Sequence, residues 1–364
     1  MSSLHAKETA TVGTTRSKRM FDSTILFVII ACRLHCAAAA RSGGFYLVTV
    51  EEAEKQAPTL KDCGFNIYGA LTYFHLKSHY RRTLEKDTAS LVFFPPYFTC
   101  EHNWPVYGGG SFDNNMARKG AGPFESSTCR KLALELATSW NHSQGQQFVI
   151  HDGSGDWLSG QDFPQMWNLS RAIIAKGNTL QSYYRRGQDI SMPPPATLNV
   201  LTYRQLMTFS KRYLVAFKGD LGTHQLRSEL AKLNNPGDGV IIVGKDNSAY
   251  DYDAIMASSV FSLVVHGHVP FSYRFSEAVC HNTIPVIIAD AWVPPFSELV
   301  PLKQYGLRVA ESEVQNLIPI LNNVSETQRE KLRVNAMRFC YSSIITPHHQ
   351  IDTLLKIIFR RTTI

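Results

Sequence analysis

Residues 261–299 read FSLVVHGHVPFSYRFSEAVCHNTIPVIIADAWVPPFSEL, and this stretch decides the fold. The apolar run 260–265 predicts a buried strand, residues 273–280 predict a helix, and residues 284–289 predict a second strand. Gly267 lies in the loop between the first strand and the helix. A strand, a helix and another strand in succession are typical of a parallel sheet flanked by helices.

The same alternation continues on both sides of this stretch. In the second half, further strands are expected at 213–218 and 239–243, and helices at 226–233, 254–258, 326–339 and 351–359. In the first half, strands are expected at 66–73, 89–96 and 147–151, with a helix-like run at 78–86 and an amphipathic helix at 128–140. The pattern therefore predicts two α/β units.

The boundary between the units is expected at Met192 to Pro195, because three successive prolines continue neither a helix nor a central strand. We divide the chain into a targeting segment (1–41), a first α/β domain (42–195), a second α/β domain (196–345) and a C-terminal helical tail (346–364).

Composition and charge exclude several classes of protein. The chain has 364 residues, of which 44% are hydrophobic and 18% are charged, so a mainly disordered or coiled-coil protein is excluded. The net charge of +7 is concentrated in residues 1–41 and in the last nine residues, and the body of the chain is neutral. A broad basic face for nucleic acid is therefore not expected.

The N-terminus has the layout of a secretory targeting segment. Basic residues precede the apolar run 24–32, TILFVIIAC, which Arg33 and His35 interrupt. The run is short for a membrane span, which favours a cleaved signal peptide and a lumenal or secreted protein. The alternative is an uncleaved signal anchor, which would make the chain a single-pass type II protein of the Golgi membrane with its body in the lumen.

Sequons and cysteines agree with a lumenal location. Acceptor sequons for N-glycosylation start at Asn141, Asn168 and Asn323. Five cysteines lie beyond the targeting segment, and we predict one or two disulfides, with Cys100 and Cys129 as a candidate pair. There is no CxxC pair and no histidine cluster at zinc-ligand spacing, so no metal site is predicted.

The stretch 261–299 resembles the nucleotide-sugar region of the exostosin family, glycosyltransferase family 47. The matching positions are Gly267, Ser272, Arg274, Phe275, Glu277, Ala278, Ile284, Pro285, Val286, Asp290, Pro295 and Phe296. Upstream, Phe217-Lys218-Gly219 followed by Arg227 is similar to a second family motif, and His151-Asp152-Gly153 to a third. The resemblance implies a GT-B fold with two Rossmann-like domains facing across a cleft. It also implies inverting transfer from a UDP-sugar to a glycan, proteoglycan or polysaccharide acceptor, without a metal cofactor.

The same stretch supplies groups that suit a nucleoside diphosphate. A loop that leads from a strand into a helix presents backbone donors and a positive dipole end to phosphate oxygens. Gly267 permits close approach, and Arg274 and Arg227 are expected on the diphosphate. Glu277 is expected on the ribose or on Arg274, and the alternative for Arg274 is an ordinary ion pair with Glu277. Lys218, His266 and Ser272 complete the expected donor site.

An inverting transfer also needs a general base near the acceptor hydroxyl, for which the loop at 151–156 offers His151, Asp152 and Asp156. As an alternative, the two aspartates form turns with the neighbouring glycines. Asp251-Tyr-Asp253 has the form of a metal-binding Asp-x-Asp motif, but we interpret Asp253 as the N-cap of the helix at 254–258.

Departures from the family pattern leave rival functions open. His266 stands where many relatives have arginine, so one cation of the loop becomes a titratable imidazole. Ser262, Asn282 and Thr283 stand where the family has cysteines or Gly-Cys, so a disulfide there is not expected. The alternatives are a noncatalytic glycan-binding or partner subunit and a secreted polysaccharide hydrolase using Asp152 and Asp156. The sequence is compatible with a homo- or a hetero-oligomer.

Overall fold

The computed structural model describes residues 44–63, 67–95, 126–139, 147–152, 172–177, 179–193, 203–268, 270 and 272–362. The N-terminal targeting segment, Asn141, Asn168, Asp156 and the side chains of Cys100 and Cys129 lie outside the described residues. Within this part of the chain, no helix has the length and apolar character needed to span a bilayer.

The first half forms a six-stranded sheet in the order β2-β1-β3-β4-β5-β6, in which every neighbouring pair is parallel. The strands are β1 (Phe45–Leu47), β2 (Arg82–Thr83), β3 (Leu91–Phe93), β4 (Gln147–Asp152), β5 (Ala172–Lys176) and β6 (Ile190–Ser191). Its helices are α2 (Val50–Gln56), α3 (Ile67–Ser78) and α4 (Ser126–Ser139). The predictions for β3, α4 and β4 are confirmed.

Two predictions in this half are wrong. Residues 67–73 of the predicted strand at 66–73 belong to helix α3, and the predicted helix at 78–86 contains the end of α3, a turn and β2. Tyr68, Thr72 and Leu76 are buried at four-residue spacing along α3, so one helical face packs into the core. The β-branched and aromatic residues suggested a strand, and this tertiary burial outweighs their intrinsic preference.

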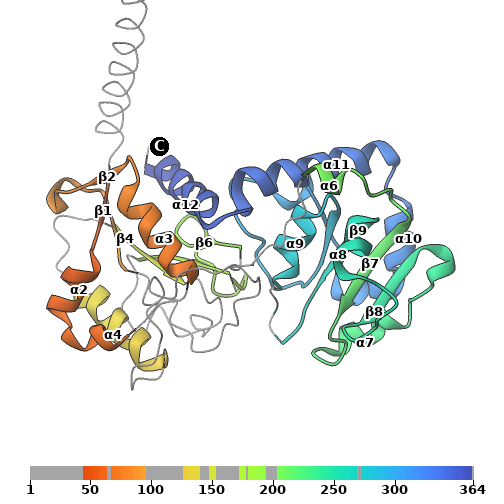
Figure 1. Ribbon diagram of the computed structural model, residues 1–364, viewed down its shortest axis with the longest axis horizontal. Helices are drawn as coiled ribbons and strands as arrows, with labels where there is room; N and C mark the ends of the chain where they lie inside the picture. The colour runs from red at the N-terminus through yellow and green to blue at the C-terminus, as the bar shows by residue number, and fades with distance from the viewer. Residues whose placement is uncertain are drawn as a thin grey trace, which may run out of the picture.

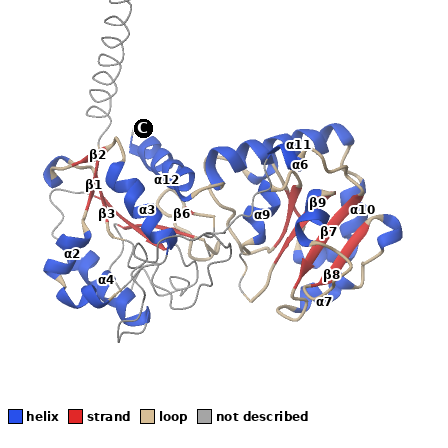
Figure 2. Cartoon of the chain, in the orientation of Figure 1, coloured by secondary structure: helices blue, strands red, loops and turns tan. Residues whose placement is uncertain are grey.

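The second half forms a five-stranded parallel sheet in the order β11-β10-β9-β7-β8, flanked by helices (Figure 2). The strands are β7 (Tyr213–Gly219), β8 (Val240–Gly244), β9 (Ser259–Val265), β10 (Ile284–Ile288) and β11 (Leu307–Arg308). The helices are α6 (Tyr203–Leu206), α7 (Gln225–Ala231), α8 (Tyr252–Ala257), α9 (Arg274–Cys280), α10 (Leu317–Asn322) and α11 (Glu326–Phe339). The strands and helices predicted for this half are confirmed within a few residues at their ends.

The last helix returns to the first domain. After α11 the chain makes a π-helical turn at Cys340–Ile344, and α12 (Pro347–Thr362) then packs against α3 (Figure 1). Ile351 and Leu354 of α12 are fully buried in one cluster with Phe45 of β1. The tail predicted for residues 346–364 is therefore a helix that completes the core of the first domain.

Hydrogen bonds to main-chain carbonyl groups also join the two domains. Val293 N donates to Thr179 O at 2.8 Å, and Phe296 N donates to Ser191 O at 2.8 Å. The side chain of Trp292 is fully buried, and its Nε1 donates to Gly177 O at 3.1 Å. Because these bonds are short and shielded, they fix the segment after β10 to the carboxyl edge of the first sheet.

A disulfide joins Cys280, at the end of α9, to Cys340, directly after α11. Both cysteines are completely buried. Cys63 is also disulfide-bonded. The prediction of at least one disulfide is confirmed, although the Cys280–Cys340 pair was not the one that the sequence suggested.

Candidate functional site

The predicted donor site lies at the carboxyl edge of the second sheet. β7 ends at Gly219, β9 at Val265 and β10 at Ile288, and parallel strands present these ends at the same edge. The loops that follow carry Arg227, His266 and Arg274 into or next to the adjoining helices. Open α/β sheets bind their ligands at this edge, so the structure brings the predicted set to a suitable place.

Arg227, on α7, is held by main-chain carbonyl groups. Its Nε donates to His266 O at 2.9 Å, its Nη1 to Asp220 O at 3.0 Å, and its Nη2 to Val265 O at 2.9 Å. A Cβ atom added to Gly267 would lie 2.7 Å from Arg227 Nη2. Gly267 is therefore required because the guanidinium occupies the space of a side chain.

Arg274, the first residue of α9, contacts the ring of Phe217, as Arg227 does. Its Nη2 donates to the carbonyl oxygen of Lys218, and its Cζ lies 4.5 Å from the centre of the Phe217 ring. The Arg227 Cζ lies 5.4 Å from that ring. Phe217 thus supports two guanidinium groups through cation–π contacts with both.

Neither arginine forms an ion pair among the described residues, so the alternative of an Arg274–Glu277 ion pair is not what the structure shows. Glu277 instead accepts a hydrogen bond from the hydroxyl of Tyr252, whose pKa is raised by burial. Burial and the nearby charge of Arg274 lower the pKa of Arg227 to about 10. Two adjacent cations bonded to neutral carbonyls leave N–H groups and positive charge available for an anion.

Lys218 and Ser272 have local structural partners. Lys218 Nζ donates to Tyr250 O at 2.7 Å, which ties the end of β7 to the loop before α8. Ser272 Oγ accepts a hydrogen bond from Arg274 N at 3.3 Å, at the start of α9. Both residues lie at the predicted edge, and their contacts orient the backbone next to Arg274.

His266 belongs to a small polar network that includes residues the sequence did not suggest. Its Nδ1 lies 3.2 Å from Glu311 Oε1, and its ring stacks on His224 with centroids 4.3 Å apart. Burial lowers the pKa of His266, while Glu311 opposes that shift. Asp290 N donates to the same Glu311 oxygen at 2.9 Å. Glu311 lies 45 residues from His266, so no local pattern could have identified it.

The Asp-x-Asp motif is engaged by the protein itself. The N-cap of α8 is Asp251, whose Oδ1 accepts from Ala254 N at 2.8 Å, so the prediction of Asp253 as the cap is wrong by two residues. Asp253 Oδ1 lies 3.2 Å from Nε2 of the buried His281. Helix α8 begins at Tyr252, before the predicted start at Ala254, which moves the capping position back.

The general-base candidates lie on the first domain. His151 is near the end of β4 and is buried, and neither of its ring nitrogens has a hydrogen-bond partner among the residues that the structure describes. Burial lowers its pKa to about 4, and its ring centroid lies 5.7 Å from that of Tyr68. Asp152 ends β4, but its side chain and all of Asp156 lie outside the described residues. The third sequon residue, Asn323, is exposed at the end of α10.

Comparison with known proteins gives a consistent set of relatives. The exostosin-1 homolog of Caenorhabditis elegans is 26% identical over 255 residues, which cover 61% of this chain and 66% of that protein. The probable beta-1,4-xylosyltransferase IRX10L of Arabidopsis thaliana is 26% identical over 276 residues, which cover 67% of this chain and 61% of that protein. The chain matches about 28% of the length of exostosin-1 of Drosophila melanogaster.

Among solved structures, that of Anabaena Alr3699/HepE in complex with UDP-glucose is similar. The two sequences are 15% identical, and the TM-score is 0.37. The match covers 74% of this chain and 79% of the other chain. The α/β fold with two parallel-sheet domains is the GT-B class that the sequence predicted. The family model described as the Exostosin GT47 domain matches residues 49–324. Since this match spans well over half of the sequence, the chain belongs to the exostosin GT47 family.

Proposed function

We propose that the chain is an inverting glycosyltransferase that transfers a sugar from a UDP-sugar to a hydroxyl group of a glycan acceptor in the secretory pathway. In this proposal the second domain binds the donor and the first domain binds the acceptor. Membership of the exostosin family supports the reaction class. The relative named as a probable beta-1,4-xylosyltransferase is consistent with it.

The observation that carries the proposal is the pair Arg227 and Arg274. Each guanidinium is anchored by main-chain carbonyls at the carboxyl edge of the sheet. The UDP leaving group gains negative charge as its bond to the sugar breaks. Fixed cations that need no reorganisation stabilise this charge in the transition state. Glu277, held by Tyr252, lies one turn along α9 from Arg274 and is the group we assign to the ribose hydroxyls.

The candidates for the general base lie at the end of β4 and in the sequence that follows it. His151 is the weaker candidate because both of its ring nitrogens are buried, and a base must come within hydrogen-bond reach of the acceptor hydroxyl. Asp152 and Asp156 are therefore the stronger candidates, and Asp152→Asn and Asp156→Asn variants test them separately. The base is the residue whose loss lowers kcat and leaves the KM for the donor unchanged.

The test of the reaction is UDP release by the purified full chain in a screen of UDP-sugars and glycan acceptors. Buffers without added Mg²⁺ or Mn²⁺ test the proposal that the donor needs no metal. Arg274→Ala is expected to abolish turnover while the protein remains folded. Arg338→Ala, which removes an exposed arginine of α11, is the matched control and is expected to leave turnover unchanged. Full activity of Arg274→Ala would refute the site assignment.

One observation favours the noncatalytic alternative. The lowered pKa of His266 makes this ring neutral at neutral pH, so the donor loop lacks the cation that many relatives have there. A subunit that has lost donor binding would show no thermal shift with UDP. A ligand at about 100 times its Kd stabilises a protein by about 2.7 kcal/mol, so binding would be readily measured.

A further inference from the structure

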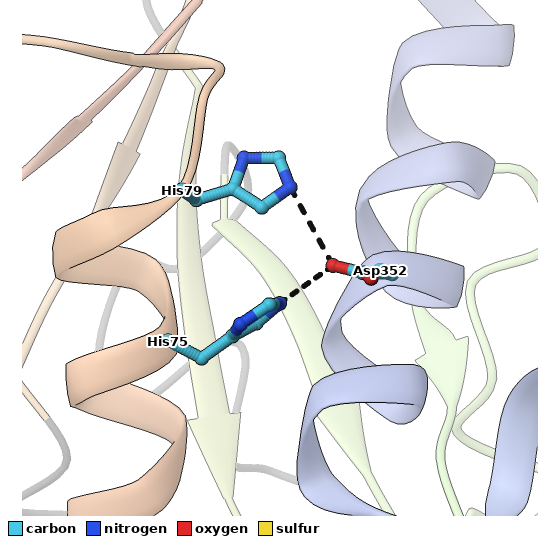
Figure 3. Close-up of side chains that lie close together, drawn as sticks. All are labelled: His75, His79 and Asp352. Atoms are coloured by element: carbon cyan, nitrogen blue, oxygen red, sulfur yellow. Dashed lines mark hydrogen bonds and ion pairs between the residues drawn. The ribbon is translucent and has the colours of Figure 1, made fainter. Parts of the chain in front are cut away.

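A cluster of metal-ligating side chains lies where the C-terminal helix meets the first domain, remote in the fold from the edge that carries Arg227 and Arg274. His75 lies on α3, His79 directly follows that helix, and Asp352 lies on α12 (Figure 3). Figure 3 shows both imidazoles pointing toward the carboxylate. His75 Nε2 lies 2.6 Å and His79 Nε2 3.5 Å from the same oxygen, Asp352 Oδ1.

The donor atoms have the composition and spacing of a metal site. One ligand atom from each of the three residues lies within 4.8 Å of the other two. Two imidazole nitrogens and a carboxylate oxygen form a donor set that suits Zn²⁺ and related transition metals, whereas Mg²⁺ and Ca²⁺ prefer oxygen ligands. A three-ligand set also leaves a fourth tetrahedral position for water.

The two histidines are partly buried, whereas Asp352 is exposed. His75 is partly shielded by His348, whose ring stacks on it with centroids 4.4 Å apart. His79 Nδ1 accepts from Arg81 N at 3.1 Å. Coordination through Nε2 places the ring proton on Nδ1, so metal binding would break this contact with the Arg81 amide.

We propose that His75, His79 and Asp352 bind one divalent cation of the Zn²⁺ class, which fastens α12 to α3. The two helices are 277 residues apart in sequence at this contact, and a metal there closes the first domain around its final helix. The expectation that no histidines stand at zinc-ligand spacing is therefore wrong for His75 and His79, which are four residues apart. The third ligand, Asp352, is too distant along the chain to be linked to them from the sequence.

The test uses the full chain, stripped of metal by a chelator and dialysed. Zn²⁺ is then titrated in, with Mg²⁺ in a parallel series. Bound metal is measured by elemental analysis after gel filtration, and stability is measured by the thermal midpoint. The expected result is one Zn²⁺ per chain and a rise of several degrees in Tm with Zn²⁺ but not with Mg²⁺.

Two variants remove ligands, and one serves as a control. Asp352→Asn keeps the shape of the side chain, and His79→Ala removes an imidazole. Each is expected to lower Zn²⁺ affinity at least about tenfold, since even outer-shell changes cost about 10- to 100-fold. His349→Ala removes a histidine of α12 outside the cluster, which contacts Thr346, and should retain Zn²⁺ binding. Failure of the wild-type chain to retain stoichiometric Zn²⁺, or equal affinity in Asp352→Asn, would overturn the proposal.

Discussion

Replacing Gly267 with alanine is expected to displace Arg227 while the protein remains folded. The new Cβ would lie 2.7 Å from Arg227 Nη2, whereas ordinary contacts begin at 3.4 Å, so the guanidinium must move by about 0.7 Å. A movement of this size is enough to break the 2.9 Å bond to Val265 O. The cost to folding is small because the displaced atoms are the end of a flexible side chain.

The consequence falls on donor binding. A hydrogen bond from a charged group contributes about 1.5–3 kcal/mol. Loss of one such contact to the diphosphate therefore raises the KM for the UDP-sugar about 10- to 150-fold. The assay is UDP release as a function of donor concentration, accompanied by thermal unfolding to confirm the fold. Gly222→Ala is the matched control, because its Cβ would meet Asp220 Oδ1 at 3.5 Å, an ordinary contact.

An unchanged donor KM in folded Gly267→Ala would contradict this prediction, because it would mean that the position of Arg227 has no influence on the donor. A large fall in Tm would also contradict it, since the clashing atoms belong to a movable side chain. A raised KM in both glycine variants would indicate a general effect on the loops, and would remove the specific role given to Gly267.

Three further predictions concern stability. The Cys280→Ala, Cys340→Ala double variant is expected to lose about 4 kcal/mol in free energy of unfolding, from a sequence separation of 60. A reducing agent should lower the Tm of the wild type more than that of the variant, which keeps the disulfide of Cys63. The folded-state pKa of His151 lies below its ordinary value, so the free energy of unfolding should fall by up to about 3 kcal/mol as pH drops from 6.5 to about 4. Chemical denaturation across this pH range checks the prediction. If the stability of His151→Leu fell with pH in parallel with that of the wild type, His151 would not be the group responsible. Trp292→Ala is expected to cost about 3–5 kcal/mol by leaving a cavity between the domains, and a loss below about 1 kcal/mol in urea unfolding would mean that the site repacks.

The second domain could be predicted well from sequence because its elements follow local rules. β9 and β10 are continuous apolar runs buried on both faces, and α9 lies between them with Arg274 at its first turn. The positions of Arg227 and Arg274 followed from the family motifs. Their geometry did not, because the carbonyls that hold them come from the ends of other strands and from the loop after β7.

The first domain was harder because its signals are weak or distant. The strands β1, β2 and β6 have only two or three residues, too few to show a period. Helix α3 carries Tyr, Thr and Phe residues that favour a strand in isolation, and its packing surface is supplied partly by α12 from the far end of the chain. Neither that surface nor the partners of His266 could be read from neighbouring residues.

The return of α12 to the first domain means that the polypeptide passes between the two lobes twice, once between β6 and β7 and once after α11. Proteolysis between β6 and β7 would leave the strands of the first lobe held to the rest of the chain by the noncovalent packing of α12. The lobe that carries Arg227 and Arg274 is thus an insertion within the other lobe in chain order. A chimera that exchanges donor specificity between family members would need two splice junctions, one before β7 and one before α12. A single splice between β6 and β7 would also replace the helix that fills the core of the first lobe.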